Sequence, residues 1–150
     1  MNAELVEIRP ARSEDFNGVL ELLRQLWPEG KLDESRLRPI FERALNSETQ
    51  AYRCAINTKQ VVGFASLNLK NRLWAEGSLA WVDEIVVDAS YRGQGIGTRL
   101  LAELEKVALQ NNCARLELDS SFHRTSAHQF YERRGFERRA ALFSKRILPR

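Results

Sequence analysis

The chain has 150 residues, of which 43% are hydrophobic and 29% charged, and this suits a single domain over residues 1–150 with a substantial core. Its net charge of +3 is too small to indicate nucleic-acid binding, and no apolar run approaches the ~20 residues of a membrane span or opens a signal peptide. Cys54 and Cys113 lie far apart without metal-type spacing, so we expect two reduced thiols in a cytoplasmic protein.

The first third of the chain predicts one strand and two helices. Residues 4–9 alternate apolar and charged side chains, as a strand with one buried face does. Ser13 is a suitable N-cap for a helix whose apolar stripe extends to Trp27. Asp33 is a suitable cap for a second helix, which Pro39 is expected to kink or shorten.

The middle of the chain predicts a β-hairpin, a further strand and a long helix. Residues 51–56 and 61–69 form the predicted hairpin, and residues 81–87 are rich in β-branched and aromatic side chains. Three alternating glycines separate this strand from apolar residues at helical spacing, which continue to about residue 111.

The glycine-rich turn has the properties of a phosphate-binding loop. A helix N-terminus leaves backbone N–H groups without partners at the positive end of the dipole, and glycines let the backbone approach a ligand closely. Arg92 adds a fixed positive charge. The spacing Gly93-x-Gly95-x-Gly97 fits neither the dinucleotide fingerprint nor a P-loop. A glycine-rich turn that binds no ligand is the alternative.

The last third predicts a strand over residues 115–121, a helix around Ala127, and a closing strand over residues 136–148 that is bent or broken near Ala140. The order of elements is then β-α-α-β-β-β-α-β-α-β. A mixed sheet with helices on both faces is the natural packing of this order.

Two motifs resemble those of the GCN5-related N-acetyltransferase (GNAT) family. Arg92-Gly93-Gln94-Gly95-Ile96-Gly97 resembles the family's pyrophosphate loop, and the stretch from Arg124 through Phe130-Tyr131 to Gly135-Phe136 resembles its late helix. The resemblance implies an α/β fold of the α+β type. Its central sheet is mixed and mostly antiparallel, helices lie on both faces, and a splayed strand pair holds acetyl-CoA.

The resemblance also implies acetyl-CoA as co-substrate and the backbone that binds it. The amides of Val86 and Val87 should pair with the pantetheine arm like an added strand, and the amides of the glycine loop should hold the pyrophosphate. An amide near Val86 is the implied oxyanion donor. The implied acetyl-CoA-binding residues are Ile85, Val86, Val87, Arg92, Gly93, Gln94, Gly95, Ile96, Gly97 and Thr98.

The implied reaction is direct attack of an amine on the thioester in a ternary complex, with Glu84 as base, directly or through water, and Tyr131 as acid. Strand alternation puts Glu84 on one face with Val82 and Val86, and Asp83 on the other, unless a β-bulge disturbs it. Tyr131 is protonated at neutral pH and can donate to the leaving thiolate. The alternatives are substrate binding or a structural ion pair for Glu84, with Asp83 as base, and core packing for Tyr131.

The acceptor is expected to be the primary amine of a small molecule. Arg124 stands where many family members carry asparagine, and the form Arg-x-x-Ala-His-x-Phe-Tyr resembles a subset that includes aminoalkylphosphonate and aminoglycoside acetyltransferases. Trp27, Asp83, Arg124 and His128 are the candidate substrate contacts. No metal site, membrane partner or nucleic-acid partner is predicted.

Two other functions stay open. Acetylation of a protein N-terminus or lysine would need an open groove for a peptide. A non-catalytic acyl-CoA-binding regulatory module would bind acetyl-CoA without turnover, and Glu84 and Tyr131 argue against it. Family members are often dimers, and the sequence leaves a homodimer open.

Overall fold

The computed structural model describes residues 5–149 and follows the predicted order of elements as far as the late helix. The chain divides between Glu117 and Leu118 into two compact units. That the two units form one domain stays a prediction. Within the described residues, no helix is both long and apolar enough to cross a bilayer.

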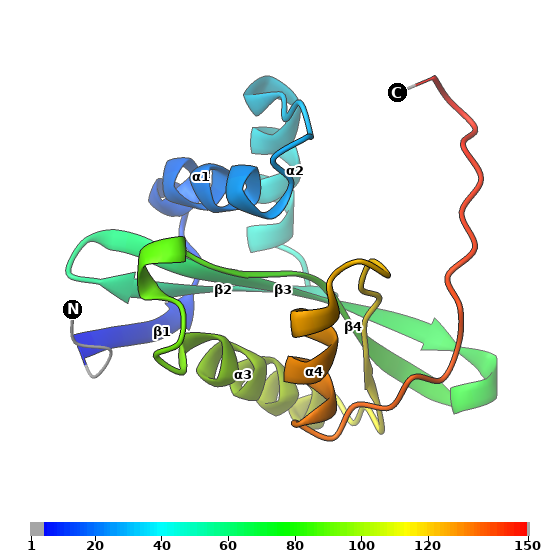
Figure 1. The fold of residues 1–150 in the computed structure, drawn as a ribbon. Coiled ribbons are helices and arrows are strands. Elements are labelled where there is room, and N and C mark those ends of the chain that lie inside the picture. The colour runs from blue at the N-terminus through cyan, green and yellow to red at the C-terminus, as the bar shows by residue number, and fades with distance from the viewer. Residues whose placement is uncertain (1–4, 150) are drawn as a thin grey trace. The chain divides into compact units, whose positions relative to one another are not determined.

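The described part of the first unit is built on a five-stranded sheet (Figure 1). Its strands are β1 (Val6–Pro10), β2 (Gln50–Asn57), β3 (Gln60–Arg72), β4 (Gly77–Val87) and β5 (Leu116–Glu117). They lie in the order β1-β2-β3-β4-β5, with antiparallel pairing from β1 to β4 and parallel pairing between β4 and β5. This confirms the predicted mixed, mostly antiparallel sheet.

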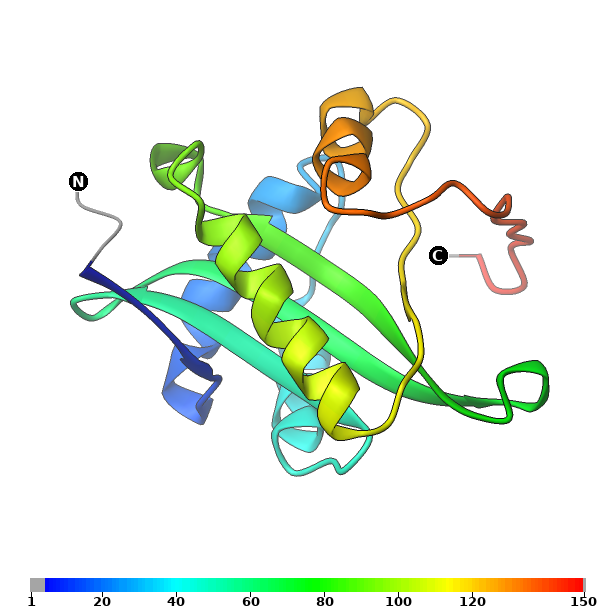
Figure 2. The same ribbon diagram turned by 90° about the horizontal axis from the view of Figure 1, so that it is seen from below.

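Helices cover both faces of the sheet (Figures 1 and 2). Helices α1 (Phe16–Leu26) and α2 (Glu34–Leu45) lie on one face, here called the α1/α2 face, and α3 (Ile96–Gln110) crosses the other. Short 3-10 turns η2 (Ser13–Asp15), η3 (Leu73–Ala75) and η4 (Ala89–Tyr91) occur in the connections.

Aromatic side chains join both helices to the α1/α2 face of the sheet. The ring centroids of Phe16 and Phe41 are 5.4 Å apart, those of Phe41 and Tyr52 are 5.6 Å apart, and those of Tyr52 and Phe64 are 5.2 Å apart. Such tilted pairs contribute about 1 kcal/mol each beyond the area they bury. The chain of four rings therefore fixes α2 over β2 and β3.

Small residues let α3 approach the opposite face closely. A Cβ atom added at Gly63 would lie 3.0 Å from Cδ1 of Leu100 and 3.1 Å from Cβ of Ala55. Leu100 and Leu104 have no exposed surface, so this contact belongs to a dry interface. The strand thus uses glycine here because a larger side chain would separate helix and sheet.

One predicted helix cap is confirmed, another is wrong, and the proline inside the second helix does not end it. Asp33 caps α2 as predicted, because its side chain accepts a hydrogen bond of 2.9 Å from the amide of Ser35. Pro39 lies inside α2 without ending it. Ser13 is not the N-cap of α1; it begins the 3-10 turn η2, and its hydroxyl donates to Glu42 instead.

The second unit contains helix α4 (Thr125–Glu132), which matches the predicted late helix. The predicted strand over residues 115–121 is confirmed only at Leu116 and Glu117. The predicted closing strand over residues 136–148 is wrong: in the described part of this segment no strand forms, and apolar side chains such as Phe143 and Ile147 are exposed. A segment with apolar residues becomes a strand only where another strand shares its backbone hydrogen bonds.

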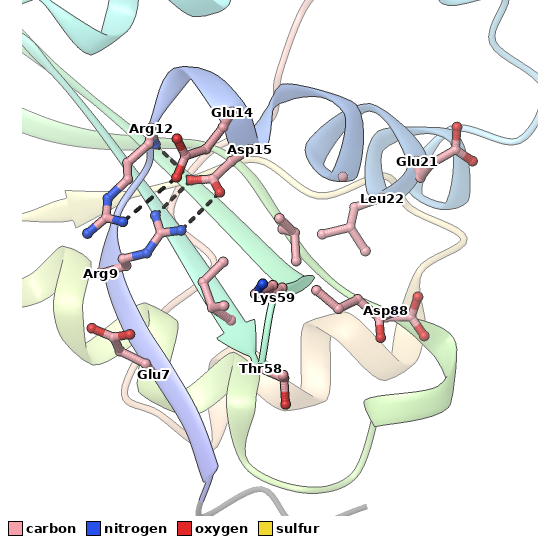
Figure 3. Close-up of a pocket in the computed structure, with 14 residues that line it drawn as sticks. Glu7, Arg9, Arg12, Glu14, Asp15, Glu21, Leu22, Thr58, Lys59 and Asp88 are labelled. Atoms are coloured by element: carbon pink, nitrogen blue, oxygen red, sulfur yellow. Dashed lines mark hydrogen bonds and ion pairs between the residues drawn. The ribbon is translucent and has the colours of Figure 1, made fainter.

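Arg9 and Asp15 form a buried ion pair that ties β1 to the start of α1 (Figure 3). Nη1 and Nη2 of Arg9 lie 2.7 and 3.0 Å from the two carboxylate oxygens, and the amide of Arg12 donates to the same carboxylate at 2.7 Å. Burial alone would raise the pKa of Asp15, but these hydrogen bonds outweigh it and lower the pKa. The pair lies in the wall of an open cavity of about 700 Å³ between β1, α1 and the β2–β3 turn.

Replacement of Asp15 by asparagine should destabilise the protein by about 3 kcal/mol at pH 7, because it leaves the Arg9 charge buried without its partner. A depressed carboxyl pKa adds stability above the unfolded-state pKa and loses it as the pH falls through the folded-state pKa. The difference between the native protein and Asp15→Asn should therefore shrink below about pH 4. Urea unfolding at several pH values measures this.

The matched control is Glu14→Gln, because Glu14 forms a solvent-exposed ion pair with Arg12 at 3.8 Å. Exposed pairs contribute about 0.5 kcal/mol or less, so this variant should unfold almost as the native protein does. Equal, pH-independent losses in Asp15→Asn and Glu14→Gln would contradict the role given to Asp15.

Candidate active site

The connection from β4 to α3 is fixed by hydrogen bonds in its first half. The amide of Asp88 donates to the carbonyl of Val62 at 2.8 Å, and its side chain accepts from the amide of Ser90 at 2.8 Å. This second bond is the main cause that lowers the pKa of Asp88. The side chain of Gln25 in α1 bonds at one end to Asp88 (3.1 Å) and at the other to the amide of Ala89 (3.0 Å).

The second half of the connection is the glycine turn that the sequence singled out. Gly93 and Gly95 have φ values of +75° and +83°, which side chains other than glycine rarely adopt. Gly95 is the N-cap of α3, so the amides of the first helical turn have no partner within the helix. Arg92 stands at the entrance, where its Nε donates to the carbonyl of Val87 at 3.1 Å.

This turn fits an anionic ligand. A Cβ atom at Gly93 or Gly95 would meet no atom within 4 Å, so space lies beside the backbone at both positions. Among the described residues, the side-chain oxygen of Gln94 is buried without a hydrogen-bond partner. Backbone amides, the positive end of the α3 dipole and the Arg92 guanidinium together favour a phosphate group at this place.

Glu84 lies at a β-bulge in β4. Ser66 of β3 pairs with Glu84, whereas the next residue, Leu67, pairs with Val82, so Asp83 is the extra residue. Neighbouring residues of β3 point to opposite faces, and Glu84 and Val82 therefore do so as well. This corrects the simple alternation, which put them together.

The carboxylate of Glu84 is on the α1/α2 face. Its register partner Ser66 pairs in turn with Tyr52 of β2, and Tyr52 packs against α2 through Phe41. Burial raises the pKa of Glu84, the hydrogen bond from Ser66 lowers it, and the charge of Asp83 raises it further. Burial, together with the nearby Glu84 and Asp83, raises the pKa of Tyr52 to about 12, which keeps Tyr52 protonated.

The outer edge of β4 is paired over a short distance. Within the described residues, β5 pairs with β4 at Ala80 and Trp81 only, while β3 pairs with β4 from Gly77 to Val87. From Val82 to Val87 the strand therefore has a side that β5 does not use. This is the segment that contains Glu84 and the implied pantetheine-binding residues.

In the second unit, Tyr131 packs between two phenylalanines of the same unit. Its ring centroid lies 5.3 Å from that of Phe130 and 5.6 Å from that of Phe136. Burial raises the pKa of Tyr131, the positive charge of Arg124 opposes this, and Asp119 adds to it. Tyr131 is thus a protonated hydrogen-bond donor at neutral pH.

The four predicted substrate contacts lie on different elements of the structure. Trp27 is the C-terminal cap of α1 and is 38% exposed, and Asp83 is the exposed residue of the bulge. Arg124 precedes the first turn of α4, and the Nε2 atom of His128 lies 2.9 Å from the carbonyl oxygen of Ser121. Within residues 5–149, no group of three or more histidine, cysteine or acidic side chains could hold a metal.

The predicted site residues are divided between the two units. Glu84, Asp83 and the glycine turn lie at the end of one strand in the first unit, whereas Tyr131, Arg124 and His128 belong to the second. Sequence reasoning missed Ser66 and Tyr52, which face Glu84 across the sheet. The only available signal was a serine in the apolar run of β3.

The mixed sheet and the glycine turn agree with an acyltransferase fold, and the family match gives the class. The chain belongs to the acetyltransferase (GNAT) family, whose model matches residues 16–136. It is an N-acetyltransferase, and its co-substrate is acetyl-CoA.

Comparison with individual proteins agrees with this assignment. The chain is 33% identical over 141 residues to an aminoalkylphosphonate N-acetyltransferase of Salmonella typhimurium, and the aligned region covers 94% of this chain and 91% of the relative. It is 31% identical over 134 residues to a glucosamine 6-phosphate N-acetyltransferase of Trypanosoma brucei brucei, covering 87% and 88%. The fold matches AAC(6')-Iy, solved with the bisubstrate analogue CoA-S-monomethyl-acetylneamine, with a TM-score of 0.81 and 23% identity over 95% and 99% of the two chains.

Gly95→Ala should weaken acetyl-CoA binding about tenfold while the protein stays folded. A Cβ at this position meets no neighbour, so the change acts through the backbone, where a φ of +83° costs a non-glycine residue about 1–2 kcal/mol. The strained turn should then point its amides elsewhere. Calorimetric titration with acetyl-CoA measures the change.

Gly77→Ala is the matched control, since a Cβ at Gly77 also meets nothing and Gly77 does not need a positive φ. It lies at the far end of β4 from the glycine turn. Equal loss of affinity in both variants would show that the turn has no special part in binding.

Proposed function

We propose that the protein transfers the acetyl group of acetyl-CoA to the primary amine of a small molecule by direct attack in a ternary complex. The observation that carries the proposal is the half-buried Glu84 carboxylate at the bulge of β4, which Ser66 contacts. It stands on the strand that has an edge unused by β5 and that leads into the glycine turn.

The proposed base is Glu84. An amine attacks only in its neutral form, so its proton must leave, and a carboxylate whose pKa is raised by burial is a better proton acceptor near neutral pH than an ordinary one. The transfer can pass through one water molecule. Asp83, at the same bulge, is the alternative base.

The proposed leaving-group acid is Tyr131. The amine nitrogen forms a bond to the thioester carbon, the carbonyl electrons move to oxygen, and an amide N–H near Val86 stabilises this oxyanion. The oxyanion then collapses to re-form the C=O bond as the C–S bond breaks, and the thiolate takes the phenolic proton to give free CoA. The surplus proton on the new amide nitrogen leaves and, through water, reprotonates the phenolate. A tyrosine kept protonated by burial suits this step.

The glycine turn is proposed to bind the pyrophosphate of CoA through the amides of Gln94, Gly95, Gly97 and Thr98, with Arg92 close by. The amides of Val86 and Val87 are proposed to bind the pantetheine arm as an added strand would be bound. Support comes from the positive φ of Gly93 and Gly95 and from the limited pairing between β4 and β5.

The proposed acceptor is an amine that also carries an anionic group. The two named relatives act on an aminoalkylphosphonate and on glucosamine 6-phosphate, and both names describe an amine joined to a phosphorus oxyanion. Arg124 and His128 are the proposed contacts to the anion, and Trp27 and Asp83 are proposed contacts to the rest of the acceptor. We also propose that the protein acts in the cytoplasm, and a homodimer stays possible.

The test of the proposed function is turnover of acetyl-CoA against a panel of amines, with mass spectrometry of the acetylated products. The panel holds 2-aminoethylphosphonate, glucosamine 6-phosphate, an aminoglycoside, a polyamine and short peptides with a free N-terminus or lysine. We expect the phosphorus-containing amines to give the most product. Product from the peptides alone would favour a protein acetyltransferase, and acetyl-CoA binding with no product at all would favour a regulatory module.

Glu84→Gln and Tyr131→Phe should each lower kcat about a hundredfold, because each removes one proton transfer. The affinity for acetyl-CoA, measured by calorimetry, should stay within about twofold, because neither side chain is proposed to hold the pyrophosphate. Glu105→Gln on the exposed side of α3 is the control and should keep full activity. Full activity in both site variants would refute the roles proposed for Glu84 and Tyr131.

A further inference from the structure

Ser66 is a fully buried polar residue in the centre of the sheet. Its side chain has no exposed surface, and it lies in β3 between Ala65 and Leu67, which are also fully buried. A buried hydroxyl costs free energy unless its hydrogen bonds are made. The partners of Ser66 therefore decide what this serine contributes.

Both hydrogen bonds of the Ser66 hydroxyl go to one residue. The backbone amide of Glu84 donates to Oγ of Ser66 at 2.9 Å, and Oγ contacts Oε2 of the Glu84 carboxylate. Because an amide N–H can only donate, Oγ must accept there. Its own proton is then available for the carboxylate, so the direction of both hydrogen bonds is fixed.

The β-bulge makes this double contact possible. The extra residue Asp83 shifts the register between Ser66 and Leu67, and the amide of Glu84 bonds to a side chain at this point. The hydroxyl thus reaches both the backbone and the carboxylate of the same residue. Such a two-point contact sets the orientation of the Glu84 side chain as well as its position.

We propose that Ser66 is a positioning residue for the acetyl transfer: its hydroxyl holds Oε2 of Glu84 and thereby directs the second carboxylate oxygen, Oε1, to the acceptor amine or to the water that carries its proton. This inference rests on the proposed function, in which Glu84 is the base. Ser66 acts through Glu84 and does not itself touch a substrate.

The groups that face Glu84 from the neighbouring elements are few within the described part of the chain. Asp83, on the same strand, raises the pKa of Glu84, and Tyr52 on β2 is a protonated phenol. Neither supplies a positive charge that would keep the half-buried Glu84 carboxylate ionised. The hydroxyl of Ser66 is the group that favours the ionised form, because a carboxylate accepts its hydrogen bond.

The first experiment measures Glu84 in the free protein and needs no substrate. Glutamate carboxyl carbons are labelled with ¹³C, and the Glu84 signal, assigned by its loss in Glu84→Gln, is titrated by NMR. In Ser66→Ala the midpoint should move to higher pH, because the group that lowers the pKa is gone. Ser66→Thr, which keeps a hydroxyl, should stay near the native midpoint, and Ser78→Ala, a serine elsewhere on β4, should not move it.

The second experiment measures kcat/KM against pH with acetyl-CoA and 2-aminoethylphosphonate. Ser66→Ala should lose about tenfold in kcat near neutral pH, and the acidic limb of its profile should shift to higher pH. When Glu84→Gln is already present, adding Ser66→Ala should cause no further loss of kcat. Ser66→Thr should restore most of the activity, and the KM for acetyl-CoA should not change in any of these variants.

The results separate the two hypotheses. An unmoved Glu84 midpoint in folded Ser66→Ala overturns the inference about Ser66, whatever the activity. Equal losses from Ser66→Ala with and without Glu84 would also overturn it, since the effect would then be structural. Full activity of Glu84→Gln, by contrast, would overturn the proposed base while the NMR result still stood. Circular dichroism melting shows which variants are folded. If Ser66→Ala is not folded, Ser66→Cys, a weaker donor, replaces it, and the Glu84 midpoint and kcat should change in the same direction.

Discussion

The unequal pairing of β4 is the constraint on which the rest of this structure depends. On one side β4 pairs with β3 along its length, and on the other it pairs with β5 only at Ala80 and Trp81. A strand edge presents unpaired amides and carbonyls, which need hydrogen bonds from elsewhere. β4 is therefore paired with β3 along its length and with β5 over two residues, and its end leads into the glycine turn.

The same strand presents the Glu84 side chain to the α1/α2 face without losing its ladder with β3. The bulge at Asp83 meets both needs, because it shifts the alternation by one residue and lets Ser66 bond the amide of Glu84 with its side chain. Val82 then packs towards α3 while Glu84 faces α1 and α2. The orientation of the Glu84 side chain and the register between β3 and β4 therefore both depend on the bulge and on Ser66.

Much of the fold could be predicted because the relevant signals are local. The glycine turn, the Asp33 cap and the order of strands and helices all follow from short stretches of sequence. The family was evident from two motifs, and the match over residues 16–136 confirms it. The cap predicted at Ser13 was wrong because a 3-10 turn over Ser13–Asp15 precedes α1, and the Ser13 hydroxyl bonds to Glu42 of another helix.

The candidate site could be predicted only where it depends on sequence order. Glu84 and the glycine turn are close in the chain, whereas the contact between Ser66 and Glu84 depends on strand register and on a bulge that no composition reveals. The closing strand failed for a related reason. Residues 136–148 contain several apolar side chains, but a strand also needs a partner strand, and the presence of a partner depends on the whole fold.

The bonds of Gln25 have a consequence for how this enzyme can be re-engineered. Gln25 lies in α1, yet both ends of its amide hold the turn that leads to the glycine loop, through Asp88 and Ala89. Helix α1 thus helps to hold the turn that precedes the glycine loop, although the bonded residues are more than sixty positions apart in the chain. A library that varies α1 has to keep glutamine at this position if both bonds are to remain, because a shorter or singly bonding side chain cannot make the two together.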